Sequence, residues 1–433
     1  MDRAKIARHN IIALIIEGSL FWSGLAFLEA NTVVPLFITS FTGSVVLAGL
    51  AATLRNVLFL LGQVIMGMFI HKFRRQGPPL RILSVISRTT ILIMFLIMLM
   101  GVRGYPAVIA FLILYGIYFF ADGLLAIMWL ETCARTVPPR DRGMIMNIQQ
   151  IIGGTAGIFI GFVVRNILKS HWSLEQQFTV LFLLAGIVLL FDAASMFAIK
   201  DVPHESDPQR PVPGPITYFK GFVPLLKDSA LFRRLMVCRL LFNLSFAAQS
   251  MYMAMGIREG RLSAAQQGTL VLMPVIGQIL GGLLWTFVSR NKGYPLVMLL
   301  GMVLQTLCAV ISLIALWAMG MGQSIMIPLC IILMLMAADS PAYVGFTQHM
   351  MLNVDQQRRA QYIVLMALMI TPATFAPVLA GTAINSFGYL PVFIVALAVS
   401  GLGLFLIYDG FFRKRNPHYY KHGMPQPGDL SLD

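Results

Sequence analysis

The chain has 433 residues, of which 58% are hydrophobic and 12% are charged, and it carries a formal net charge of +14 at pH 7. Soluble domains carry charge on about a quarter of their residues, so this composition excludes an ordinary soluble protein and indicates a polytopic membrane protein. The 32 Lys and Arg residues are spread over many segments of the chain, which argues against nucleic acid as a partner.

Twelve apolar segments follow one another, and each is long enough for a helix of about 20 residues to cross a bilayer. The first follows a basic start, as in a signal peptide, but its apolar run is longer and lacks a small-residue cleavage site. We therefore expect an uncleaved first helix and an all-α polytopic membrane protein with twelve transmembrane helices. The expected spans are residues 11–36, 46–70, 82–101, 106–130, 144–168, 178–199, 234–256, 266–289, 294–318, 325–347, 361–384 and 389–411.

The distribution of Lys and Arg predicts the orientation of these spans. If the N-terminus is cytoplasmic, 24 of the 32 basic residues fall in inner segments and 5 in outer segments. Cytoplasmic loops carry such an excess, so we expect both termini in the cytoplasm and a basic rim against anionic lipid. The short outer loops, and the absence of an N-x-S/T sequence outside the spans, are typical of a bacterial inner membrane protein.

The longest polar stretch separates the sixth span from the seventh. Residues 200–234 are rich in Pro and in charge and are too short for a folded domain, so we expect a cytoplasmic linker with a surface helix near 217–231. The expected organisation is an N-terminal six-helix half at 1–199, a linker at 200–233, a C-terminal six-helix half at 234–412 and a cytoplasmic tail at 413–433.

The two expected halves share landmarks in the same order. The stretch "LGQVIMG" at 61–67 is similar to "IGQILGG" at 276–282, and Arg142 matches Arg359 at an offset of 217 residues. The stretch "ADG" at 121–123 matches "ADS" at 338–340 at the same offset, so that Asp122 has a twin, Asp339. Such a parallel repeat predicts two halves related by an axis along the membrane normal.

The loop after the second span carries a further pattern. It reads Gly67-Met-Phe-Ile-His71-Lys72-Phe-Arg74-Arg75, which is similar to the G-x-x-x-D-[RK]-x-G-[RK]-[RK] signature of the major facilitator superfamily. His71 stands at the acidic position and Arg74 at the second glycine. With the 6+6 layout and the central linker, the chain resembles this superfamily over nearly its whole length. The resemblance implies alternating access, helices 1, 4, 7 and 10 around a central cavity, and an inner gate formed by Gly67, His71, Lys72, Arg74 and Arg75.

Asp122 and Asp339 fall within the fourth and tenth spans, which the resemblance places at the cavity. Asp122 shares a helical face with Tyr115, and Asp339 shares one with Tyr343. Acidic groups beside aromatic rings suit a cationic or amphipathic substrate or a proton site. We expect the two aspartates to face one cavity from opposite halves. The alternative is structural, with each aspartate bonding backbone or pairing with an arginine to hold helices together.

Other polar residues also fall inside the spans. Glu29 and Arg55, in the outer halves of the first two helices, could form a structural pair, or Glu29 could contact substrate or protons. Arg239, Asn243 and Ser250 form a polar stripe on the seventh helix. That stripe is a candidate for substrate or proton coupling, although Arg239 could instead bond carbonyls at the inner end.

Three residues in the spans favour a structural interpretation. Glu17 and Arg88 both fall in the inner third of their helices, so Arg88 could reach the headgroups, with Glu17 as its partner or as an inner-gate residue. Asp192, on the sixth helix, is expected at a helix contact or facing the inner rim.

The sequence contains none of the catalytic motifs HExxH, G-x-S-x-G or a phosphate-binding Gly-Lys-Ser/Thr loop, and its four cysteines have no metal-ligand spacing. We therefore expect no cofactor, no metal and no enzyme. The expected function is secondary active transport, coupled to protons, of a small molecule, with export of amphipathic or cationic compounds. The expected partners are this substrate, a proton or other coupling ion and the lipid bilayer, and the expected state is a monomer. The alternatives are a lipid flippase on the same fold and a polytopic membrane enzyme.

Overall fold

The structure is a computed structural model that describes residues 3–29, 33–202, 212–228, 230–246, 255, 264–339, 343–355 and 358–413. This part of the chain is helical and contains no strand, and ten of its helical stretches are long and apolar enough to cross a membrane. The predicted fold class, an all-α polytopic membrane protein, is confirmed.

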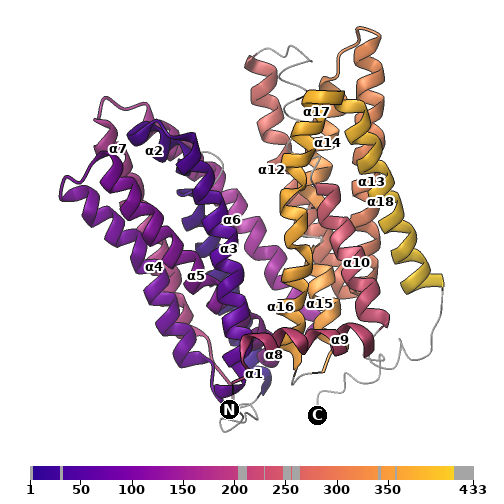
Figure 1. Ribbon diagram of the computed structural model, residues 1–433, viewed down its shortest axis with the longest axis horizontal. Coiled ribbons are helices and arrows are strands. Elements are labelled where there is room, and N and C mark those ends of the chain that lie inside the picture. The colour runs from indigo at the N-terminus through magenta and orange to yellow at the C-terminus, as the bar shows by residue number, and fades with distance from the viewer. Residues whose placement is uncertain are drawn as a thin grey trace. The chain divides into compact units, whose positions relative to one another are not determined.

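The chain divides into two compact units, Met1–Tyr218 and Phe219–Asp433. The first unit contains the indigo to magenta helices of Figure 1, and the second contains the helices that run from rose to yellow. The helices of the first unit are α1 (Arg3–Ala26), α2 (Val33–Thr42), α3 (Val45–Phe69), α4 (Gly77–Leu99), α5 (Gly104–Thr136), α6 (Pro139–Leu168), α7 (Leu174–Ser195) and the short α8 (Pro215–Lys220).

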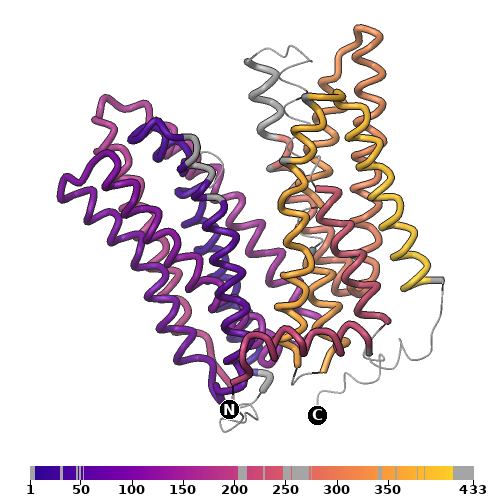
Figure 2. The backbone as a smooth tube through the Cα atoms, in the orientation of Figure 1, coloured from indigo at the N-terminus to yellow at the C-terminus, as the bar shows by residue number. Residues whose placement is uncertain are grey.

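Figure 2 traces the backbone of the second unit, whose colour runs to yellow at the C-terminal end. Its helices are α9 (Phe222–Asp228), α10 (Ala230–Ser245), α12 (Ala264–Lys292), α13 (Tyr294–Gly320), α14 (Met326–Asp339), α15 (Tyr343–Asn353), α16 (Arg359–Ile370), α17 (Ala376–Phe387) and α18 (Tyr389–Tyr408). The outer end of the predicted seventh span lies outside the described residues, apart from Met255.

The same pairs of helices pack together in both units. In the first unit α3 packs on α5, α4 on α7 and α1 on α7, and in the second the corresponding pairs are α12 with α14, α13 with α18 and α10 with α18. The matched glycines explain the first of these contacts. A Cβ on Gly62 would overlap the backbone carbonyl of Phe120, and one on Gly277 would overlap that of Met334. The sequence repeat therefore marks a close helix crossing that occurs once in each unit.

The first predicted span, 11–36, is wrong as a single helix, because α1 ends at Ala26 and α2 begins at Val33. Past the end of α1, the N–H groups of Phe27 and Leu28 bond three residues back, to Gly24 and Leu25. Pro35 lies in the first turn of α2, where a residue without an N–H is tolerated, whereas inside a continuous helix it would break the backbone hydrogen bonds.

Proline also accounts for an interruption in the second unit, within the predicted eleventh span. The predicted tenth span contains α14, described as far as Asp339, and the start of α15, described from Tyr343, and residues 340–342 lie outside the described residues. The predicted eleventh span changes at Ile370 to a 3₁₀ turn containing Pro372, and α17 follows with Pro377 in its first turn. A proline lacks the backbone N–H that a continuous α-helix requires, which explains the change at Ile370.

The start of the predicted linker is fixed to the first unit. Both N–H groups at the start of α4, on Gln76 and Gly77, donate to Oδ2 of Asp201 at 2.6 and 2.9 Å. Asn10 of α1 bonds the backbone of Lys200 twice, at 2.7 and 2.9 Å, and Arg81 of α4 donates to the carbonyl of Ile199 at 3.1 Å. A carboxylate at a helix N-terminus is favourable, so Asp201 caps α4.

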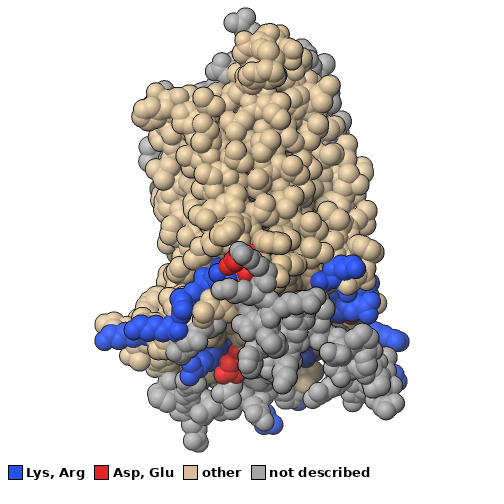
Figure 3. Space-filling view, turned by 90° about the vertical axis from the view of Figure 1, so that its right-hand side faces the viewer, with Lys and Arg blue, Asp and Glu red and all other residues tan. Residues whose placement is uncertain are grey.

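Basic side chains gather at one end of the face shown in Figure 3, while the face beyond them bears no visible charge. This separation is what a membrane protein requires, because charged side chains are costly in the hydrocarbon region and favourable near headgroups.

Candidate functional site

In the first unit, Arg88 bridges two aspartates from different helices. Its Nη1 lies 2.6 Å from Oδ1 of Asp122 on α5, and its Nε lies 2.8 Å from Oδ2 of Asp192 on α7. All three residues are buried. A buried arginine needs such partners, and its planar guanidinium can donate to two carboxylates in fixed directions. The bridge therefore joins α4, α5 and α7.

Further contacts fix the Arg88 guanidinium in place. Nη1 also donates to Oγ of Ser87 at 2.9 Å. The guanidinium carbon lies 4.9 Å from the ring centre of Phe21 and 5.3 Å from that of Tyr118. Aromatic faces attract a cation, so the charge of Arg88 is held between rings as well as carboxylates. This corrects the expectation that Arg88 reaches the headgroups.

Glu17 of α1 lies beside this bridge and is also buried. Its Oε2 accepts a hydrogen bond from the indole Nε1 of Trp129 on α5, at 2.8 Å. Asp192, Arg88 and Asp122 all act on it electrostatically. The ion-pair partners of Arg88 are Asp122 and Asp192, and the hydrogen-bond donor to Glu17 is Trp129. These pairings were not predicted from the sequence, which suggested Glu17 as the partner of Arg88.

In the second unit, Asp339 belongs to α14 and is fully buried. Its Oδ2 accepts a hydrogen bond from Nε2 of Gln305 on α13 at 2.5 Å, whereas its Oδ1 has no hydrogen-bond partner among the described residues. Trp285 of α12 donates to the adjacent carbonyl of Ala338 at 2.6 Å. These two hydrogen bonds join α14 to α12 and α13 at Ala338 and Asp339.

Arg239 and Asn243 of α10 lie on the side predicted to be polar, and they have different surroundings. Arg239 is buried, acts electrostatically on Asp339, and has its guanidinium carbon 5.7 Å from the ring centre of Phe242 and 5.4 Å from that of Phe346. Asn243 donates to the carbonyl of Arg239 on its own helix at 2.8 Å. Ser250 and the side chain of Tyr343 lie outside the described residues.

The repeat extends to the partners of the two aspartates. Gln305 follows Arg88 by 217 positions, the offset that relates Asp339 to Asp122. The pair Arg88–Asp122 therefore recurs as Gln305–Asp339, with a neutral amide in place of the cation. Sequence reasoning missed Gln305 because a glutamine in a span attracts little notice, although applying the offset to Arg88 would have found it.

A second pair of positions obeys the same offset. Arg234 and Asp409 follow Glu17 and Asp192 by 217 positions, and they form an ion pair in which Nη2 of Arg234 lies 3.0 Å from Oδ2 of Asp409. The second unit thus has a cation and an anion where the first unit has two carboxyl groups.

Glu29, Arg55 and Tyr115 lie in one neighbourhood of the first unit. Tyr115 is buried, and both Glu29 and Arg55 act on it electrostatically. The guanidinium carbon of Arg55 lies 5.2 Å from the ring centre of Phe119. The backbone carbonyl of Glu29 accepts hydrogen bonds from Val33 and Val34 at the start of α2. An ion pair between Glu29 and Arg55 stays a prediction.

The predicted gate residues form one short connection. Gly67 is buried near the end of α3, His71 and Lys72 belong to a 3₁₀ turn, and Arg74 and Arg75 are exposed before α4. The carboxylate of Asp201 lies directly after them, at Gln76 and Gly77. The connection therefore has an acidic neighbour from another part of the chain, although His71 replaces the acidic residue of the signature.

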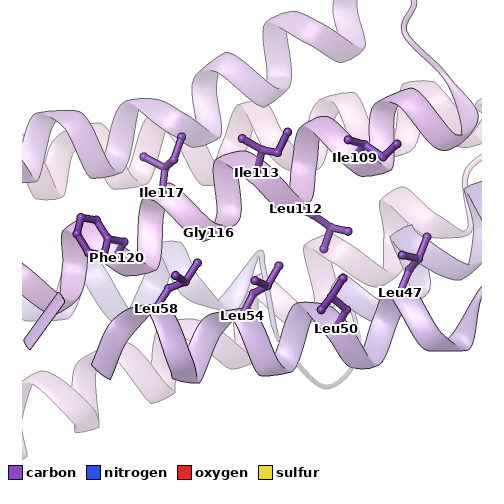
Figure 4. A pocket seen from close by; sticks show the side chains of 10 residues that line it. All are labelled: Leu47, Leu50, Leu54, Leu58, Ile109, Leu112, Ile113, Gly116, Ile117 and Phe120. Carbon is purple, nitrogen blue, oxygen red and sulfur yellow. The ribbon is translucent and has the colours of Figure 1, made fainter. Parts of the chain in front are cut away.

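An apolar groove of about 530 Å³ lies between α3 and α5, separate from these charged groups. Figure 4 shows Leu50, Leu54 and Leu58 of α3 along one wall, with Leu112 and Gly116 of α5 opposite. All of its lining residues are apolar. The groove can accept hydrocarbon but offers no side chain that would recognise a charge.

A family model described as the Major Facilitator Superfamily matches residues 18–371. No curated protein sequence matches the chain.

Solved structures share the fold over almost the whole chain. The transporter FucP in its outward conformation is 15% identical, with a TM-score of 0.69, and the match covers 94% of this chain and 100% of FucP. A bacterial homologue of the iron transporter ferroportin is 16% identical with a TM-score of 0.70, covering 93% and 99%. The proton:xylose symporter XylE is 13% identical with a TM-score of 0.69, covering 94% and 96%.

Proposed function

The chain belongs to the major facilitator superfamily, and from this premise we propose that it is a proton-coupled secondary transporter that moves a small molecule by alternating access. Membership makes it a multi-pass membrane transporter, with a fold seen in transporters rather than in enzymes. The proton coupling, the substrate class and the orientation with both termini in the cytoplasm belong to the proposal.

The proposed proton coupling rests mainly on the surroundings of Asp339. It is a fully buried carboxyl group in α14, its hydrogen-bonded partner is a neutral amide, and Oδ1 has no hydrogen-bond partner among the described residues. Ionisable groups inside membranes are rare and usually have a functional role. A group in this setting can accept a proton or face a cationic substrate.

Asp122 takes a different part in this proposal. Asp122 is ion-paired with Arg88, and this pair stabilises the packing of α4 against α5 in the first unit. In this proposal the two aspartates have different roles. Asp339 exchanges its partner during transport, whereas Asp122 stays bound to a fixed cation. The roles of Glu29, Arg55, Arg239, Asn243, Tyr115 and Tyr343 in substrate or proton coupling, and of the 67–75 connection as inner gate, remain part of the proposal.

The proposal is tested on protein reconstituted into vesicles. A screen for small molecules that raise the unfolding temperature first identifies a ligand, because a ligand of the folded state stabilises it by mass action. We expect this ligand to accumulate when a pH gradient is imposed, and the accumulation to collapse when a proton ionophore is added. Accumulation that is insensitive to the ionophore would contradict proton coupling, and empty vesicles provide the control.

The groove between α3 and α5 favours a second candidate function, the movement of lipid. Its lining residues on α3 run from Leu47 to Leu58, which is about 16 Å of helix and matches the roughly 15 Å of hydrocarbon in one leaflet. A lipid acyl chain fits both this length and the apolar lining.

If the protein moves lipid, Leu54→Trp, which fills the groove, should slow the transfer of a fluorescent phospholipid between the leaflets of the same vesicles. Leu96→Trp, at an exposed apolar position on α4, serves as the matched control. Equal rates in wild-type vesicles and in vesicles without protein would exclude lipid movement.

A further inference from the structure

We propose that Glu17 holds a proton in the first unit, next to an arginine whose Nε and Nη1 are bonded to two other carboxyl groups. This inference rests on the proposed proton coupling and deepens it by naming a carrier that the aspartate pair does not include. It follows from the charges that surround Glu17, from the donor that it contacts, and from its counterpart in the second unit.

The first observation is an excess of buried acid. Glu17, Asp122 and Asp192 are each less than a tenth exposed, and one guanidinium, that of Arg88, acts on all three. With every group ionised the cluster would carry two uncompensated negative charges inside the membrane. Buried charge without a partner is very costly, and the group takes up a proton instead.

The second observation is that Arg88 bonds to the two aspartates and that Glu17 has a different hydrogen-bond donor. Nε and Nη1 are bonded to Asp192 and Asp122, and the guanidinium is enclosed by Phe21 and Tyr118. The hydrogen bond to Glu17 comes from the indole N–H of Trp129, a neutral donor. Because a neutral donor stabilises a carboxylate less than a guanidinium does, the proton is held most favourably on Glu17.

Among the described residues, the groups packed around Glu17 from the other helices include no further cation that acts on it. Arg88 faces it from α4, Asp122 and the indole of Trp129 from α5, and Asp192 from α7. Cys133 of α5 is also close enough to interact electrostatically, and from α6 the neutral Gln149 packs against the adjacent Gly18.

The third observation is the counterpart pair Arg234–Asp409. By the offset of 217 residues, Arg234 stands in for Glu17 and Asp409 for Asp192, and in the second unit the two are joined by an ion pair. The repeat therefore brings these two positions near each other in both units. In the second unit, Asp409 is paired with the cation of Arg234. In the first unit, the position of that cation is occupied by the carboxyl group of Glu17. Two neighbouring carboxyl groups are more stable when they share one proton than when both are ionised.

The experiment is infrared spectroscopy of the purified full-length protein at neutral pH, without substrate. An un-ionised carboxyl group absorbs through its C=O stretch at a frequency distinct from that of a carboxylate, and the band shifts on exchange into heavy water. We expect wild-type protein to show this band and Glu17→Gln to lose the component due to Glu17. The double variant Asp122→Asn, Asp192→Asn should lose the same component, because Glu17 and the Arg88 guanidinium then balance in charge without a proton.

Asp409→Asn is the matched control, because Asp409 is ion-paired, and it should leave the band unchanged. Retention of the full band in a folded Glu17→Gln protein would overturn the inference, and if that variant does not fold, retention in the double variant Asp122→Asn, Asp192→Asn would do so. This readout is independent of transport. If the band disappears as expected while ligand accumulation ignores the pH gradient, the proposed coupling fails and the proton site on Glu17 stands.

Discussion

Gradient-driven transport is expected to fall at least about tenfold in the Asp339→Asn variant, while exchange of the ligand without a gradient persists. The amide keeps the size of the side chain and can still accept the hydrogen bond from Gln305, but it can neither bind nor release a proton. Expression should hold, because a neutral amide is easier to bury than a carboxylate. Vesicles with an imposed pH gradient, and vesicles with ligand on both sides and no gradient, measure the two activities.

The twin substitution provides the comparison for this result. Asp122→Asn leaves Arg88 bonded to Asp192, so the guanidinium keeps one carboxylate and the loss of transport should be smaller. If Asp339→Asn transports normally under a gradient, Asp339 is a structural residue and the proposed coupling at this position is wrong. An equal loss in both variants would instead assign the coupling to both aspartates.

The largest effect on stability is expected from Arg88→Met. Removing one partner of a buried ion pair leaves bare charge behind and costs about 3–5 kcal/mol, and here two carboxylates lose their shared cation. The unfolding temperature in detergent should fall by about 10 °C. The control is the triple variant Arg88→Met, Asp122→Asn, Asp192→Asn, which removes the stranded charges and should recover most of the loss.

The repeat supplies a second control for the arginine bridge. Gln305→Met removes the corresponding partner of Asp339, and because that partner is neutral the cost should be about 1–3 kcal/mol. An Arg88→Met protein as stable as Gln305→Met would mean that the bridge contributes no more than a neutral hydrogen bond, which would contradict the description of Arg88 as the fixed cation of the first unit.

The helices and their repetition could be predicted from sequence because they depend on local properties. The length of each apolar run, the distribution of Lys and Arg, and the matched glycines are all visible along the chain. The break between α1 and α2 was missed even though Pro35 marks it, because apolar residues continue on both sides of the break and conceal it.

The composition of the charged cluster could be predicted only in part. Glu17, Arg88, Asp122 and Asp192 each stand out as polar residues in apolar spans, but their pairing depends on how four helices pack. The repeat offset holds the missing information: applied to Asp122 alone it yields Asp339, and applied to Arg88, Glu17 and Asp192 it yields Gln305 and the Arg234–Asp409 pair. The positions at which the two units carry different charges therefore indicate where their ionisable groups have different roles.

Because Asp201 caps α4, it limits where the coding sequence can be divided to express the two units as separate polypeptides. Residues 199–202 belong physically to the first unit, since Ile199, Lys200 and Asp201 bond to α1 and α4, and Arg135 of α5 donates to the carbonyl of Val202 at 3.3 Å. A fragment ending at residue 199, the boundary suggested by composition, would lose its own helix cap. For co-expression as separate polypeptides, the first fragment therefore has to extend past Val202, and fusion tags or affinity sites belong beyond that point.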